Sequence, residues 1–170
     1  RKKIDLQSIA GIDSYGSSFV FQLLAALARL AFVDQAGGGD FTTIQDCIDA
    51  ASPGDLCLVK PGIYYENLIW PGKAGIKLLS EEGCDATVLD GRNRDQVIGI
   101  YSGVDTTTVV RGFTIRNGTA AQGGGVYSFD YGRVEDCILT NNTADSGGGI
   151  FSQGALTFSD VTLFGNSSEN

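Results

Sequence analysis

The chain has 170 residues, enough for one domain with a buried core, and its 24 glycines indicate many tight turns. The net charge of −8 argues against a nucleic-acid partner, because phosphate binding requires a basic surface. The absence of histidine excludes Ser-His-Asp and Cys-His nucleophiles and histidine-ligated zinc, so any catalysis would fall to carboxylates, Tyr, Lys or Arg.

Residues 1–36 are interpreted as an N-terminal segment built around an apolar run from Phe19 to Val33. The basic start of the chain and the small residues after the run follow the order of a secretory signal. Arg29 inside the run and Asp34 after it argue against a signal, and the equal alternative is an apolar helix, rich in Leu and Ala, that caps the domain or packs on a neighbour. Both alternatives fit an exported protein, and the run is short for a membrane span. The second alternative predicts an assembly interface made of Phe19, Phe21, Leu23, Leu24, Leu27, Leu30 and Phe32.

Residues 41–51 predict a short N-terminal cap helix, with Thr42 or Thr43 at its start. After it, strands are expected at residues 56–59, 63–65, 68–69, 76–79, 87–89 and 97–101, separated by turn residues such as Pro61-Gly62.

The four cysteines form no C-x-x-C pair, which argues against a zinc or redox motif. Cys47 falls in the predicted helix, Cys57 in the strand after it, and Cys84 further along. We expect a disulfide among these three if the protein is exported. Cys137 occupies an inward-facing repeat position and is expected to be a small core residue.

A repeat dominates the second half of the chain. The segment from Val110 to Ser128 returns at Val134 to Ser152, with a constant offset of 24 residues and no gap, and a third copy begins at Phe158. A fixed period of this length is typical of a solenoid. Short alternating strands between Asn and Gly turns favour a parallel β-helix over a leucine-rich repeat. We therefore expect residues 37–170 to form an all-β solenoid that is incomplete at its C-terminus.

Stacked coils would place repeat-equivalent residues above one another. Amide side chains at a bend could then hydrogen-bond from coil to coil, and the glycine clusters would allow positive φ at a sharp corner. The predicted structural ladder consists of Asn117, Asn141, Asn142, Asn166, Gly125 and Gly149, with Asn141 over Asn117 and Asn166 over Asn142.

Several motifs resemble right-handed parallel β-helix proteins of the pectate-lyase-like superfamily. Those near the N-terminus match the cap and first coil of that group: Thr43-Ile44-Gln45, Ile48-Asp49-Ala50, Gly54-Asp55, Pro61-Gly62, Tyr64 and Glu66. The later Gly-Gly-Gly-Ile/Val and Leu-x-x-Asn elements are similar to repeats of polymorphic outer-membrane and other surface β-helix proteins. The resemblance covers about residues 37–170 and implies the fold. It selects no activity, because the group holds lyases, hydrolases, tailspikes and adhesins alike.

Two sets of residues are candidates for a site. Asp90, Arg92 and Asp95 bring carboxylates and a guanidinium into one loop and are catalytic candidates, with a solvated turn between coils as the favoured alternative. Tyr101, Tyr127 and Phe151 could stack on sugar rings, and the last two are repeat equivalents that would form an aromatic ladder. Such a ladder suits glycan binding or packing against another subunit.

The favoured hypothesis is a secreted or cell-surface, non-catalytic β-helix protein that is structural, self-assembling or adhesive. Its partners would be other copies of itself or an extracellular glycan, with no metal or cofactor. The alternative is a polysaccharide lyase or glycoside hydrolase, for which Ca²⁺ could bridge an acidic substrate to the acidic protein.

Overall fold

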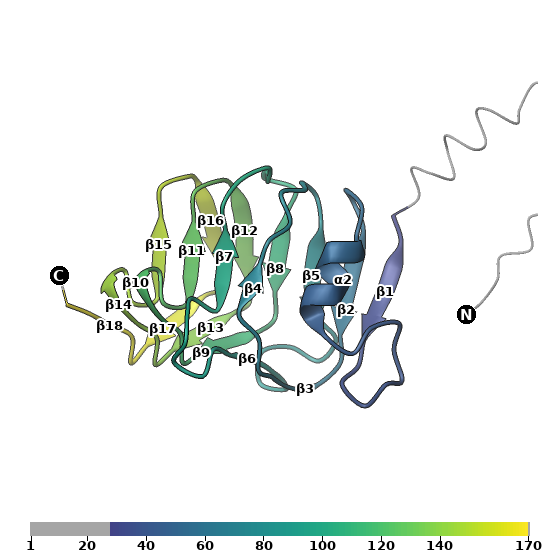
Figure 1. Ribbon diagram of the computed structural model, residues 1–170, viewed down its shortest axis with the longest axis horizontal. Helices are drawn as coiled ribbons and strands as arrows, with labels where there is room; N and C mark the ends of the chain where they lie inside the picture. The colour runs from purple at the N-terminus through teal and green to yellow at the C-terminus, as the bar shows by residue number, and fades with distance from the viewer. Residues whose placement is uncertain (1–27, 170) are drawn as a thin grey trace, which may run out of the picture.

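The computed structural model describes residues 28–169 as parallel strands wound into about six coils, which stack along the long axis of the molecule (Figure 1). Sheet A is the largest sheet, with six strands in the order β1-β2-β5-β8-β12-β16. Their bounds are Leu30–Val33 (β1), Leu56–Val59 (β2), Lys77–Ser80 (β5), Val109–Arg111 (β8), Gly132–Glu135 (β12) and Leu156–Ser159 (β16).

Three further parallel sheets complete the coils. Sheet B contains β3 (Gly62–Tyr64), β6 (Thr87–Asp90), β9 (Thr114–Arg116), β13 (Ile138–Thr140) and β17 (Thr162–Phe164). Sheet C contains β4 (Leu68–Ile69), β7 (Ile98–Ile100), β11 (Val126–Ser128) and β15 (Ile150–Ser152). Sheet D contains β10 (Thr119–Gln122), β14 (Thr143–Ser146) and β18 (Ser167–Ser168). The strands expected before residue 102 are all present, within a residue or so of their predicted bounds.

The pairing register confirms the 24-residue repeat. Ile138 pairs with Thr114 on one side and with Thr162 on the other, and Thr143 pairs with Thr119. Each partner lies 24 residues from the next, so repeat-equivalent positions of these coils lie directly above one another. Alternation along the strands then sends one set of side chains inward, and the predicted core residues Phe113 and Ile115 are fully buried.

Residues in the left-handed region form the corners of the repeat. The corner after sheet A has Gly112, Asp136 and Asp160 at successive coils, with φ of 81°, 49° and 54°. The corner after sheet B has Asn117, Asn141 and Gly165, with φ of 55°, 54° and 63°. Asn, Asp and Gly tolerate this conformation better than other residues, which explains their recurrence. Asn117 and Asn141 are therefore corner residues that set the direction of the chain.

The amide ladder lies one residue further on. Asn142 is fully buried, and its side chain accepts a hydrogen bond from Gly118 N (2.9 Å) and donates to Ile115 O (3.0 Å). It also donates to the Asn166 side chain of the next coil (3.0 Å). Asn166 in turn donates to Leu139 O (2.8 Å). The predicted stacking of Asn166 over Asn142 is present and satisfies backbone groups inside the coil.

The glycine clusters have two functions. Gly123 and Gly147 have φ of 63° and 67° and form the expected corner. Gly125 and Gly149 do not have positive φ. A Cβ on Gly125 would lie 2.5 Å from Gly149 O and 2.9 Å from Asn142 Nδ2, so this glycine is required for close packing against the next coil and the amide ladder.

Strand β1 corrects the prediction for the end of the apolar run. Leu30 and Phe32 lie in a strand that pairs in parallel with β2, and their alternation with the buried residues Ala31 and Val33 has the two-residue period of a sheet. The backbone groups of this segment hydrogen-bond to β2, and a helix here could not make these bonds. The solenoid thus begins before residue 37. The remaining predicted interface residues, Phe19, Phe21, Leu23, Leu24 and Leu27, lie outside the described residues.

Helix α2 (Ile44–Ala50) lies inside the range predicted for a short helix. The Thr43 side chain accepts a hydrogen bond from Asp46 N (3.2 Å). The Glu66 carboxylate accepts from Ile44 N and Gln45 N (3.0 and 2.9 Å), so the free amides of the first turn are satisfied. The buried face of the helix contacts β1, β2 and β4.

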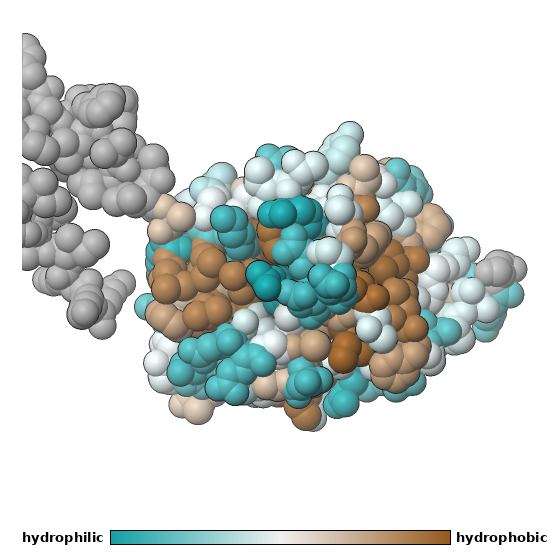
Figure 2. All heavy atoms as spheres, turned by 180° about the vertical axis from the view of Figure 1, so that it is seen from behind, coloured by the Kyte–Doolittle hydropathy of each residue, from teal (hydrophilic) through white to brown (hydrophobic). Residues whose placement is uncertain are grey.

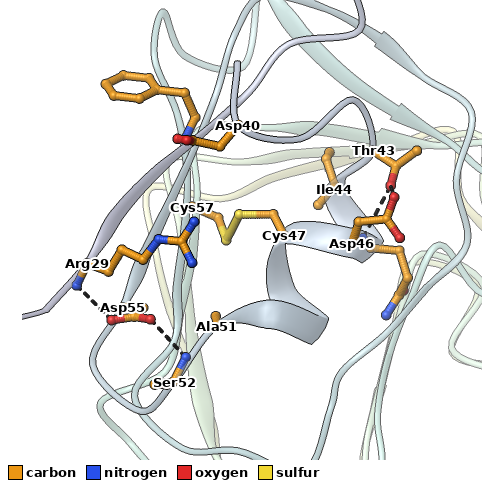
Figure 3. The surroundings of a disulfide bond; sticks show 12 residues. Arg29, Asp40, Thr43, Ile44, Asp46, Cys47, Ala51, Ser52, Asp55 and Cys57 are labelled. Carbon is orange, nitrogen blue, oxygen red and sulfur yellow. Dashed lines mark hydrogen bonds between the residues drawn. A yellow bond between two sulfur atoms is a disulfide. The ribbon is translucent and has the colours of Figure 1, made fainter. Parts of the chain in front are cut away.

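A disulfide joins Cys47 of helix α2 to Cys57 of β2, with the Cα atoms 6.2 Å apart (Figure 3). Nearby, the Asp55 carboxylate accepts hydrogen bonds from Arg29 N (2.7 Å) and Ser52 N (2.8 Å), which fixes the turn between the helix and the strand. Cys84 is a free thiol. Cys137 is also free, lies in the core as expected, and has its pKa raised to about 11 by burial.

Candidate aromatic and acidic groove

Asp90 ends strand β6 and is buried, with 5% of its surface exposed. Its carboxylate accepts hydrogen bonds from Arg92 N (3.0 Å), Arg116 Nε (2.9 Å) and Asn117 Nδ2 (2.9 Å). Burial favours the neutral acid, but these hydrogen bonds outweigh it, and the pKa of Asp90 lies below its ordinary value. Since Arg116 and Asn117 belong to the next coil, Asp90 links two coils and its oxygens are already engaged.

The structure does not gather the three catalytic candidates of the loop. Arg92 has φ of 53°, and its guanidinium lies over the ring of Tyr65, 3.9 Å from the centroid. Asp95 is exposed, and its carboxylate accepts a hydrogen bond from Gln96 N (2.8 Å). Of the three, Asp95 alone lines the groove described below.

The predicted aromatic residues do lie together. The ring centroids of Tyr101 and Tyr127 are 5.4 Å apart, and those of Tyr127 and Phe151 are 5.9 Å apart with nearly parallel planes. The parallel pair follows from the register, because Tyr127 of β11 pairs with Phe151 of β15. Phe129, which was not predicted from the sequence, packs against Tyr127, with the ring centroids 6.0 Å apart. Tyr101 and Phe129 are 46% and 52% exposed, so the cluster presents apolar surface to solvent.

A groove of about 460 Å³ lies beside this cluster. It is lined by Asp95, Gln96, Tyr101, Ala120, Ala121, Gln122, Tyr127, Asp145 and Ser146. The walls come from β10 and β14 of sheet D, from the loop before β7, and from β11 and the end of β7 in sheet C. Asp145 and Gln122 escaped sequence reasoning because sheet D was not recognised as a separate sheet. The exposed alternate positions of Thr-Ala-Asp-Ser (residues 143–146) were the available signal.

The groove is acidic and amide-rich. Its lining residues include two carboxylates and two amides but no Lys or Arg. Within residues 28–169, Asp145 makes no side-chain hydrogen bond or ion pair, so its oxygens are available to a ligand. The Gln96 side chain donates to the Tyr101 hydroxyl and holds this ring at the edge of the groove. Rings beside carboxylate and amide oxygens suit a ligand with apolar faces and many hydroxyls.

Over the described range, no group of three or more Cys, Asp or Glu side chains is arranged to hold a metal ion. The same range contains no helix with the length and apolar character that crossing a bilayer requires.

Parallel sheets wound into stacked coils define a parallel β-helix, and comparison with solved structures supports this fold. The chain is similar to a pectin methylesterase from carrot, with a TM-score of 0.54 and 17% sequence identity over 79% of this chain. The match covers 52% of the esterase, so the chain spans about half the length of that protein. No family model and no curated protein sequence matches the chain. At this identity the likeness concerns the fold.

Proposed function

We propose that this protein is an exported, non-catalytic β-helix protein that binds a glycan in the groove between sheets C and D. The observation that carries the proposal is the exposed cluster of Tyr101, Tyr127 and Phe151 beside the free carboxylate of Asp145. Export is supported by the Cys47–Cys57 disulfide, since such bonds persist in oxidising compartments.

The negative charge of the groove limits the class of glycan that it can bind. Asp95 and Asp145 would repel a polyuronate, and no cation among the lining residues offsets them. A neutral or positively charged glycan avoids that repulsion, and its hydroxyls can donate to both carboxylates. We therefore propose a neutral or cationic polysaccharide as the ligand class.

Calorimetric titration with neutral, amino-sugar and galacturonate oligosaccharides tests the proposal. We expect the first two classes to bind more tightly than oligogalacturonate. Tyr127→Ala should weaken binding about tenfold, because it removes the central ring of the cluster. Tyr131→Ala is the matched control, since Tyr131 is 50% exposed but does not line the groove. Equal affinity of the two variants, or no binding by any oligosaccharide, would contradict the proposal.

A second candidate is a glycoside hydrolase acting on the same ligand. It is favoured by one observation: Asp95 and Asp145 approach one groove from different coils, and a carboxylate pair is the usual machinery for cleaving glycosidic bonds. The assay measures the release of reducing ends from neutral polysaccharides. Esterified pectin is tested as well, for reducing ends and methanol, because the fold is similar to that of a pectin methylesterase. Turnover that Asp145→Asn abolishes without loss of binding would establish the enzyme; binding without turnover supports the non-catalytic function.

A further inference from the structure

Outward-facing apolar side chains gather on the first three strands of sheet A. Leu78 and the inward residues of β1 and β2 are buried, so the alternate positions face outward. Figure 2, which views the molecule from behind, shows an apolar area at the N-terminal end of this face, then a polar centre, and a second apolar area beyond that centre. We call the outward-facing apolar residues of β1, β2 and β5 the outer apolar patch: Leu30, Phe32, Leu56, Leu58 and Leu79.

The patch has sharp limits set by the register. Leu56 pairs with Lys77, and Leu79 pairs with Arg111, so the next position along each row is charged. Arg111 is held by an ion pair with Asp136 (2.6 Å) on the polar part of the face. The outer surface of a solenoid sheet has no need of apolar residues, and a contiguous group of five therefore indicates a contact surface.

We propose that residues 19–27 of the same chain pack onto the outer apolar patch. These residues read FVFQLLAAL and contain no charge. Val20, Leu23, Leu24 and Leu27 have the i, i+3, i+4, i+7 spacing of one helix face. Nine residues of helix extend about 14 Å, which suffices to cross three strands whose outer members are about 10 Å apart.

The connection places this segment beside the patch. Two residues separate Leu27 from β1, and the second of them, Arg29, is already fixed. Its carbonyl accepts a hydrogen bond from Leu56 N (2.8 Å), and its N–H donates to the Asp55 carboxylate (2.7 Å). Leu27 is therefore tethered within about 7 Å of the fixed backbone at Arg29. A tether this short gives the segment a high effective concentration at the patch and favours it over a separate partner.

Hydrogen–deuterium exchange on the full chain, read by mass spectrometry, tests the inference. We expect the amides of residues 19–27 to be protected, and Leu58→Lys to speed their exchange about tenfold by placing a charge in the patch. Leu58 faces outward, so the coil itself should stay folded, which the unchanged exchange of β7 and β11 would verify. Thr157→Lys, at an exposed position of the same sheet, is the control and should leave residues 19–27 protected.

Three results would overturn the inference. The first is that residues 19–27 of the unmodified chain exchange at the rate of an unstructured peptide. Alternatively, light scattering shows a dimer, and dilution to monomer removes the protection, which assigns the patch to a second copy. Finally, N-terminal sequencing of the exported protein starts after residue 27, which makes the segment a removed signal.

Discussion

Removal of the Asn142 side chain should destabilise the protein strongly, because this amide is fully buried and makes three hydrogen bonds between coils. Asn142→Ala leaves the Gly118 N–H without an acceptor and takes one donor from Ile115 O and one from Asn166. A buried polar group left unpaired costs about 1–3 kcal/mol, so we expect a total loss of about 3 kcal/mol. Against a typical free energy of unfolding of about 5–15 kcal/mol, this is a large fraction.

The assay is urea unfolding followed by circular dichroism, with the disulfide intact. Thermal melting should show a midpoint lowered by about 6–12 °C for a chain of this length. Asn67→Ala is the matched control: Asn67 is half-buried and donates to the carbonyls of Asp95 (3.1 Å) and Gln96 (3.0 Å), so water can replace part of its bonding, and we expect a loss of about 1 kcal/mol. If Asn142→Ala cost no more than Asn67→Ala, the reasoning from buried coil-to-coil bonds would be wrong.

Two further predictions concern stability. The pKa of Asp90 is lowered in the folded state, so its contribution is present above the unfolded pKa of about 4 and is lost as the pH falls through the lower folded value. Urea unfolding of the wild type should therefore show a loss of stability on acidification that Asp90→Asn reduces; identical pH profiles would refute this. Replacing Cys47 and Cys57 together by Ala should lower the free energy of unfolding by about 3 kcal/mol, because the bond closes a loop of about 11 residues. A melting curve that is unchanged by these substitutions, or by a reductant in the wild type, would show that the disulfide contributes nothing to stability.

The candidate site could be predicted from the sequence only in part. Tyr127 and Phe151 were recognisable as a ladder because they are repeat equivalents, and the register places equivalents in adjacent strands. For Asp145, the available signal was the alternation of exposed positions in residues 143–146. Asp145 and Asp95 line the same groove because sheet D faces the loop before β7. The orientation of sheet D depends on how the corners at Asn117 and Gly123 turn the chain.

The grouping of Asp90, Arg92 and Asp95 illustrates the opposite outcome. Neighbours in the sequence suggested a cluster, but two residues in the left-handed region, Arg92 and Asn93, turn the loop. Asp90 then bonds to the next coil, Arg92 lies over Tyr65, and Asp95 reaches the groove. Short separation along a chain says little about where side chains point once the backbone reverses.

The sequence by itself determined the repeat and, through it, the register, the buried rows and the Asn142–Asn166 contact, because residues 24 positions apart must stack when every coil has the same length. The tertiary structure alone decided the identity of β1. Its residues read as part of an apolar helix, and they form a strand because the free edge of β2 offers their backbone a complete set of partners. It also decided the groove, because there the loop before β7, which lies outside the 24-residue repeat, meets β10 and β14 of the repeat.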